Sequence, residues 1–208
     1  MKNGKRINIP EDEVLLFSEE EIKNRVKKLA EKIVDRFKDK ELVLVVILKG
    51  GVTFATDLHR EIERIRILNN DEDVFIEYLR ASSYGNERVT SGVVKIDFDI
   101  PYSLKNRIVL VIEDLVDTKL TLAAILSHLE TKKPEEICVC ALIEKEPDPE
   151  NLQKAYKKLD PETLKRVQNI KVEFVGFRGV KGFVKGYGLD DEGRRRGQPY
   201  ITVKKDSI

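Results

Sequence analysis

The sequence is poor in the residues on which redox, zinc and histidine chemistry depend. Its 208 residues include two cysteines, two histidines and no tryptophan. Neither a zinc site of cysteine and histidine ligands nor a Ser-His-Asp triad drawing on several histidines is easily assembled from this set. The two histidines, His59 and His128, are expected on helix surfaces. Any metal chemistry must therefore use carboxylates.

The two cysteines do not indicate a disulfide. Cys138 and Cys140 lie two positions apart in the apolar run of residues 137–143. This spacing puts both thiols on one face of a strand. We therefore expect buried, reduced thiols.

A long hydrophobic run and an excess of one charge are also missing. No apolar run approaches the roughly 20 residues of a membrane span, and residues 1–10 carry charges where a signal peptide needs an apolar stretch. The 38 Lys and Arg residues balance 37 Asp and Glu residues, for a net charge of +1. This balance gives no global reason to expect a nucleic acid or a membrane as partner, so any anion site must be local. We expect a cytoplasmic protein.

Buried strands alternating with helices dominate the pattern. Unbroken aliphatic runs at residues 42–48, 108–112 and 137–143 predict strands covered on both faces. Apolar residues at helical spacing predict helices over residues 22–37, 55–65 and 122–129, and shorter strands are predicted at residues 74–79, 93–96, 172–177 and 183–189. The pattern predicts an α/β fold, a doubly wound and mainly parallel sheet whose ligands bind beyond the carboxyl ends of the strands.

The length and the 41% hydrophobic content suit a single domain over residues 1–208. Two polar segments interrupt its pattern. Residues 81–91 are expected to form a long mobile loop, and residues 147–168 a helical excursion on the surface.

The most informative segment follows the strand at residues 108–112. Glu113 and Asp114 bring two carboxylates to the sheet edge, and a turn with hydroxyls at Thr118 and Thr121 then leads into a helix. The free N–H groups of that helix can hold a phosphate, so the segment suits a sugar phosphate whose hydroxyls need acceptors. The alternative is a polar loop whose Asp and Thr residues act only as caps.

This segment resembles the phosphoribosyl-pyrophosphate motif of type I phosphoribosyltransferases. Other segments resemble the hypoxanthine-guanine branch of that family, in the same order, from about Val14 to Val203. They are Leu48-Lys49-Gly50-Gly51, Ser82-Ser83-Tyr84-Gly85, Glu144-Lys145, Phe183-Val184, and Gly186-Tyr187-Gly188-Leu189-Asp190 followed by Arg196. Each alone has an ordinary structural explanation, such as a core aromatic or a solvated strand end. Together and in register they favour the functional interpretation.

The resemblance implies a purine salvage reaction and a type I phosphoribosyltransferase fold. A 6-oxopurine, hypoxanthine or guanine, displaces pyrophosphate from phosphoribosyl pyrophosphate to give IMP or GMP, with Mg²⁺ as cofactor. Asp117 is implied as the general acid/base at purine N7, and Lys145 as the donor to the purine 6-oxygen. The fold implied includes a small hood from N- and C-terminal segments, with residues 171–208 contributing to purine binding.

The remaining implied roles concern substrate and metal binding. Glu113 and Asp114 would bind ribose hydroxyls and the metal, with Asp190 supporting the metal. The other implied substrate-binding residues are Thr118, Lys119 and Thr121 at the 5′-phosphate, Lys49, Gly50, Gly51 and Arg196 at pyrophosphate, Ser83 and Tyr84 on a closing loop, Phe183 stacking on the base, and the carbonyl of Val184 at a 2-amino group.

The sequence departs from the family's pattern at three places. Lys119 stands where the family usually has glycine, and a lysine held at positive φ costs roughly 1 kcal/mol or more. We predict that its side chain points to solvent. Residues 178–182 are more basic than the family's turn, and residues 147–168 are longer than in compact members but are expected to touch no matched catalytic residue.

One alternative function remains open from the sequence. It is a non-catalytic nucleotide- or RNA-binding regulator on the same fold. The balanced charge and the presence of Asp117 and Lys145 favour the enzyme. The resemblance also implies a homodimer or homotetramer.

Overall fold

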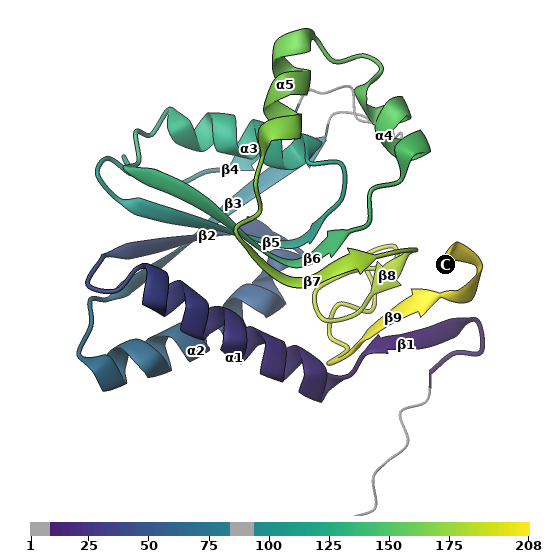
Figure 1. Ribbon diagram of the computed structural model, residues 1–208, viewed down its shortest axis with the longest axis horizontal. Helices are drawn as coiled ribbons and strands as arrows, with labels where there is room; N and C mark the ends of the chain where they lie inside the picture. The colour runs from purple at the N-terminus through teal and green to yellow at the C-terminus, as the bar shows by residue number, and fades with distance from the viewer. Residues whose placement is uncertain (1–8, 84–93) are drawn as a thin grey trace, which may run out of the picture.

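A six-stranded sheet forms the centre of the molecule. The computed structural model describes residues 9–83 and 94–208. The sheet has the order β4-β3-β2-β5-β6-β7, parallel except for β4, which pairs antiparallel with β3 (Figure 1). Its strands are β2 (Leu42–Leu48), β3 (Val74–Ser83), β4 (Val94–Phe98), β5 (Ile108–Val116), β6 (Glu136–Lys145) and β7 (Phe174–Val180). This is the predicted α/β architecture.

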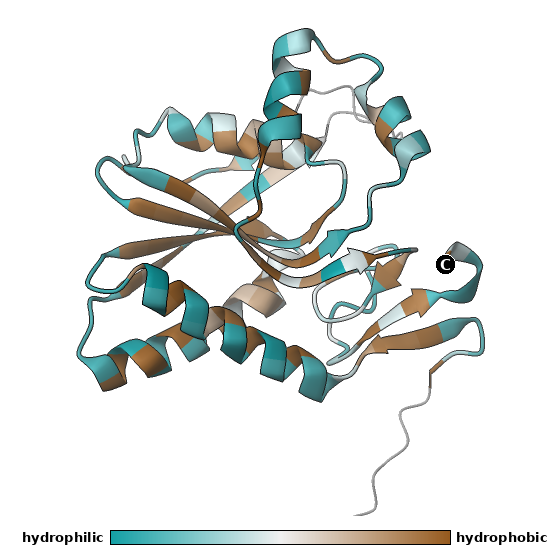
Figure 2. Cartoon of the chain, viewed as in Figure 1, coloured by the Kyte–Doolittle hydropathy of each residue, from teal (hydrophilic) through white to brown (hydrophobic). Residues whose placement is uncertain are grey.

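Helices cover both faces of this sheet. The helices α1 (Glu19–Arg36) and α2 (Gly51–Asn69) lie on one face, and α3 (Leu120–Glu130) and α5 (Pro161–Asn169) on the other (Figure 1). Alternate residues of β2 enter two separate cores, so every residue of that strand must be apolar. Figure 2 shows the resulting hydrophobic strands between helices with hydrophilic outer faces.

The helix ends follow from local chemistry. Ser18 caps α1 in a reciprocal capping box with Glu21. Asp148 and Asp160 accept hydrogen bonds from the first turns of α4 (Pro149–Tyr156) and α5, each of which has a proline near its start. The segment that connects β6 and β7 therefore contains two short helices. Among the described residues, no helix is long and apolar enough to span a membrane.

A small antiparallel sheet forms the hood. Its order is β1-β9-β8, which joins β1 (Glu13–Phe17) near the N-terminus to β8 (Val184–Lys185) and β9 (Ile201–Lys204), followed by the 3-10 helix η1 (Lys205–Ser207). The ring of Phe17 stacks on that of Phe177 in β7, with 3.7 Å between centroids. This contact joins the hood to the main sheet.

Some predicted boundaries are wrong. Residues 81–83 belong to β3 and pair with β4, although the sequence predicted a loop there; the rest of that loop, with Tyr84, lies outside the described residues. The strand predicted over residues 183–189 is reduced to β8, and Gly186 bridges to Leu189 in a turn. Hydropathy does not predict these strand ends. Backbone hydrogen bonds of a strand can continue where the side chains become polar, and they stop where the chain turns even if the side chains are apolar.

The prediction for the cysteines is confirmed. Cys138 and Cys140 are free and buried, and both side chains enter the core on the α1–α2 side of the sheet. Burial also raises the pKa of Cys138 to about 12. These thiols therefore remain protonated and belong to the core.

Candidate active site

The parallel strands place the candidate site at their carboxyl ends. From β2 the chain continues through α2 to β3, which lies on one side of β2, whereas from β5 it continues through α3 to β6 on the opposite side. β2 and β5 are parallel neighbours in the sheet. The order in which the chain adds strands therefore reverses between them, toward β3 on one side and toward β6 on the other. Such a switch point leaves a crevice where ligands bind in open α/β sheets.

The loop after β2 packs tightly against the end of β5. A Cβ atom added to Gly50 would lie 1.6 Å from the carboxylate oxygen Oδ2 of Asp114, and one added to Gly188 would lie 2.3 Å from the carbonyl oxygen of Gly50. No side chain fits at either position without displacing its neighbour. Gly50 thereby brings Lys49, the carboxylate of Asp114 and the C-terminal loop together.

Two adjacent carboxylates lie at the end of β5. The strand runs to Val116, beyond the predicted end, so Glu113 and Asp114 are held by the sheet. Desolvation and the neighbouring Asp114 carboxylate raise the pKa of Glu113 well above its usual range. A cationic ligand or a donor hydroxyl at this position would relieve that repulsion.

The turn between β5 and α3 forms a second part of the site. Residues 113 and 115–122 line a cavity of about 120 Å³. The N-cap residue of α3, Lys119, has a φ of 62° and makes no side-chain hydrogen bond to the first turn. The first intrahelical bond reaching back to Lys119 comes from Ala123, which leaves the preceding N–H groups, including that of Thr121, free for an anion.

The Lys119 side chain is not directed into solvent, so that prediction is wrong. Its ammonium donates to the carbonyl of Ile170 at 3.0 Å and lies 3.8 Å from the Glu144 carboxylate. Residues 147–168 do contact one matched substrate-binding residue. The hydroxyl of Tyr156, at the end of α4, donates to the carbonyl of Thr118 at 3.0 Å.

Asp117 and Lys145 face the same large cavity. The Nζ atom of Lys145 lies 3.4 Å from Oδ2 of Asp117, and Phe183 is 43% exposed with the Lys204 ammonium 5.2 Å from its ring centroid. The cavity has a volume of about 500 Å³, and its lining residues are Asp117, Lys145, Glu146, Pro147, Asp148, Pro149, Asn151, Lys181, Gly182, Phe183, Ser207 and Ile208. A carboxylate, an ammonium donor and an aromatic ring therefore line one cavity, a combination that suits a planar polar ligand.

The hood residues of the predicted site form a separate group. Arg196 donates to the carbonyl of Gly188 and to Oδ1 of Asp190, both at 2.6 Å, and the backbone N–H of Gly193 donates to the other Asp190 oxygen. Within the described ranges, no three His, Cys, Asp or Glu side chains are grouped as a metal site. Asp190 is thus held by Arg196, and the structure does not group it with Glu113 and Asp114.

For two further residues of the predicted site, Val184 and Ser83, we describe the position of the backbone in a strand. Val184 pairs with Val203 in the hood sheet and is not among the described residues that line the large cavity. Ser83 ends β3, the neighbour of β2, at the carboxyl edge of the sheet.

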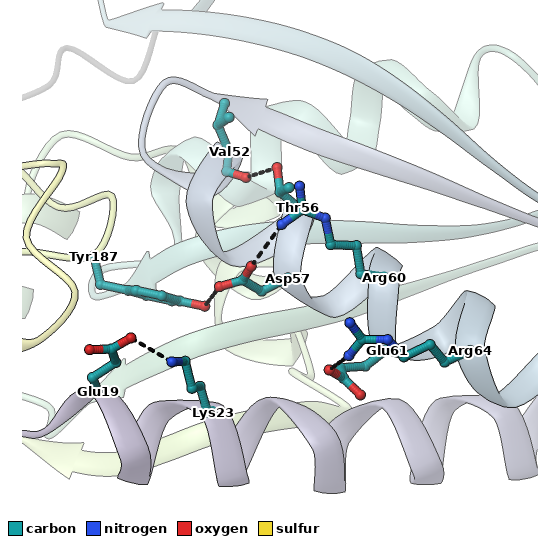
Figure 3. Close-up of polar contacts among 9 residues, drawn as sticks. All are labelled: Glu19, Lys23, Val52, Thr56, Asp57, Arg60, Glu61, Arg64 and Tyr187. Carbon is teal, nitrogen blue, oxygen red and sulfur yellow. Dashed lines mark hydrogen bonds and ion pairs between the residues drawn. The ribbon is translucent and has the colours of Figure 1, made fainter.

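One contact beside the site was not predicted. Figure 3 shows Tyr187, from the C-terminal loop, with its hydroxyl directed at Asp57 on α2. The hydroxyl donates to the carboxylate at 2.7 Å, and burial together with this bond raises the pKa of Tyr187. The bond ties the C-terminal loop to the helix that follows Lys49-Gly50-Gly51. No local signal reveals it, because the partners are 130 residues apart.

Comparison with known proteins identifies the fold. A model of the phosphoribosyl transferase domain family matches residues 16–190. The chain is 34% identical over 196 residues to the hypoxanthine-guanine phosphoribosyltransferase of Bacillus subtilis, covering 94% of this chain and 95% of that protein. The chain belongs to the phosphoribosyltransferase family.

Further phosphoribosyltransferases match over nearly the full length. The hypoxanthine-guanine phosphoribosyltransferase of Dictyostelium discoideum is 36% identical over 193 residues, which cover 92% of this chain and 95% of that protein. A crystal structure of the hypoxanthine phosphoribosyltransferase of Staphylococcus aureus superposes with a TM-score of 0.74 at 31% identity, covering 92% of this chain and 91% of that chain. These similarities extend over both the sheet and the hood.

Proposed function

We propose that this phosphoribosyltransferase transfers the 5-phosphoribosyl group from phosphoribosyl pyrophosphate to hypoxanthine or guanine, giving IMP or GMP and pyrophosphate. The full-length relatives named above carry this activity in their names, which makes the reaction a step of purine salvage. The observation that carries the proposal is the placement of Lys145 and Asp117, 3.4 Å apart, on one cavity with the exposed ring of Phe183.

The purine side of the reaction follows from these groups. The Lys145 ammonium has only hydrogen-bond donors, so it favours a 6-oxo group and opposes the donor face of a 6-amino group. Asp117, exposed beside the cavity, can exchange a proton with N7 as the base changes its bonding. The Phe183 ring provides an apolar surface on which the base can stack.

The phosphoribosyl side is bound by the two loops at the sheet edge. The free N–H groups before and within the first turn of α3 suit the 5′-phosphate. Lys49 and the close packing of Gly50 against Asp114 place positive charge and backbone donors beside the carboxylates that would bind the ribose hydroxyls. Arg196 supports this edge through Gly188, which packs on Gly50.

The carboxylate pair fits a magnesium ion shared with the substrate. Magnesium in enzymes is commonly held by one or two carboxylates together with phosphate oxygens and water. Glu113 and Asp114 supply such a pair, and a cation there would offset both the desolvation of Glu113 and its repulsion by Asp114, which together raise the pKa of Glu113. The ion would stabilise charge that develops on the leaving pyrophosphate.

The test is release of pyrophosphate from phosphoribosyl pyrophosphate with hypoxanthine, guanine, xanthine or adenine, with and without Mg²⁺. We expect Mg²⁺-dependent turnover of hypoxanthine or guanine, with kcat/KM for adenine lower by about 100-fold or more. Lys145→Met should reduce that preference. Lys181→Met is the matched control, because Lys181 lines the same cavity but is 60% exposed and pairs with Glu146. Equal turnover of adenine, or no turnover of any 6-oxopurine, would contradict the proposal.

We also propose that the chain assembles as a homodimer or homotetramer. The exposed aromatic side chains Phe75, Phe98 and Tyr102, on or near the β3–β4 edge of the sheet, support an intermolecular contact there. Sedimentation analysis of the purified protein tests this, and a monomer at micromolar concentration would contradict it.

A further inference from the structure

The helical segment between β6 and β7 holds the phosphate loop at two points. We use "helical segment" for residues 149–170, which contain α4, α5 and the C-cap residue of α5, and "phosphate loop" for residues 117–121. At one point the Tyr156 hydroxyl donates to the Thr118 carbonyl at 3.0 Å. At the other, the Lys119 ammonium donates to the carbonyl of Ile170, the C-cap residue of α5, at 3.0 Å.

The two contacts hold adjacent residues of the phosphate loop, one through the Thr118 carbonyl and the other through the Lys119 side chain. In a trans peptide the C=O of one residue and the N–H of the next point in opposite directions. The bond to Tyr156 fixes the Thr118 carbonyl toward the helical segment, so the N–H of Lys119 points to the other side of the loop. Lys119 itself has a φ of 62°, and its side chain reaches the helical segment through the bond to Ile170.

The surroundings show that these contacts are built into the fold. Tyr156 is partly buried and packs against the core on the α3 side of the sheet. Its burial and the nearby negative charge of Asp117 raise the pKa of its hydroxyl, so the group stays a donor. The Lys119 side chain is 26% exposed, and its ammonium has the Glu144 carboxylate as a second partner.

We propose that Tyr156 and Lys119 are positioning residues that hold the phosphate loop in the shape that binds the 5′-phosphate of the ribose. This inference rests on the proposed function. Tyr156 and Lys119 thereby act on phosphoribosyl binding and are not among the described residues that line the purine cavity. Loss of either contact weakens binding at the phosphate loop and leaves the purine cavity's binding groups in place.

Binding of ribose 5-phosphate, measured by titration calorimetry without turnover, tests the proposal directly. Tyr156→Phe and Lys119→Met each remove a hydrogen-bonding group and keep the size of the side chain. Each should weaken ribose 5-phosphate binding about 3- to 10-fold, the range for one lost hydrogen bond. Tyr102→Phe is the matched control, because its hydroxyl donates to Glu77 in β3 and neither residue is among the described residues that line the phosphate-loop cavity. It should bind like the wild type.

Steady-state kinetics supply a readout that a purely structural role would not change. The KM for phosphoribosyl pyrophosphate should rise by the same factor, while the KM for hypoxanthine stays within about twofold and the melting temperature is retained. If the wild type binds ribose 5-phosphate but turns over no purine, the proposed function is refuted. Weaker ribose 5-phosphate binding by the two variants would still support the positioning role. Unchanged affinity in both variants, equal rises in both KM values, or no wild-type binding would overturn the inference.

Discussion

Removing the ammonium of Lys185 should destabilise the hood strongly and in a pH-dependent way. This side chain, only 3% exposed, lies 2.7 Å from the carboxylate of Glu13 and 3.1 Å from that of Asp191. Glu13 is itself 2% exposed, and its other oxygen accepts a hydrogen bond from Thr202 at 2.6 Å. Lys185→Met would therefore leave a buried carboxylate whose remaining side-chain donor, within the described part of the chain, is the Thr202 hydroxyl.

The magnitude follows from how the variant can respond. Breaking a buried ion pair costs about 3–5 kcal/mol when the partner charge stays in place. Glu13 can instead take up a proton, which costs about 3.4 kcal/mol at pH 7 for a carboxyl of ordinary pKa 4.5, at 1.36 kcal/mol per pH unit. We therefore expect Lys185→Met to lower the free energy of unfolding by about 3 kcal/mol at pH 7.

The pH dependence has a definite sign. In the wild type the bonds from Lys185 and Thr202 hold the pKa of Glu13 below its ordinary value, despite desolvation. Its stabilising contribution is therefore complete above that value and is lost as the pH falls through the folded-state pKa. In Lys185→Met, protonation of Glu13 becomes easier as the pH falls. The difference between wild type and variant should shrink from pH 7 toward pH 5.

Urea unfolding followed by circular dichroism at both pH values measures this effect. Lys204→Met serves as the control, because Lys204 is 36% exposed and lies 3.9 Å from Asp191, and it should cost less than about 1 kcal/mol. The double variant Glu13→Gln/Lys185→Met should recover part of the loss, because it removes the unpaired charge. A loss below 1 kcal/mol at pH 7, or an equal loss at pH 5, would refute the reasoning.

Two further predictions concern the active site. Asp117→Asn should lower turnover by about 100-fold or more while calorimetry still detects nucleotide binding, because it removes the proton acceptor and keeps the shape; normal turnover would reject the assignment. Gly50→Ala should lower kcat/KM for phosphoribosyl pyrophosphate at least about 10-fold, because its Cβ would lie 1.6 Å from Asp114 Oδ2. Gly197→Ala, where an added Cβ meets nothing within 4 Å, should leave that value unchanged.

The main sheet was predictable because its physical cause is visible in the sequence. A strand covered on both faces must be apolar at every position, and the run at β2 matches its observed limits, Leu42–Leu48. The hood strands β1 and β9 lack this signal, since they have five and four residues and are partly polar. Glu13 and Lys185 look like surface residues until the fold brings them together.

The candidate site was predictable at the level of position. Parallel strands deliver the residues after them to one edge of the sheet, which brings Asp117 and Lys145 together although they are 28 residues apart. Contacts between loops do not follow from such a rule. The bonds from Tyr187 to Asp57 and from Tyr156 to Thr118 depend on how separate segments pack, and no periodicity encodes them.

Lys119 joins the phosphate loop to the helical segment, two of the places at which we expect this chain to depart from the family's pattern. Holding a lysine at positive φ costs roughly 1–2 kcal/mol, which taken alone indicates strain in the phosphate loop. The helical segment, however, ends α5 with the Ile170 carbonyl 3.0 Å from the Lys119 ammonium. A hydrogen bond to a charged group contributes about 1.5–3 kcal/mol, and less where the group is partly exposed. The strain and its compensation are of the same size, so the lysine in the loop and the helices inserted between β6 and β7 are structurally coupled.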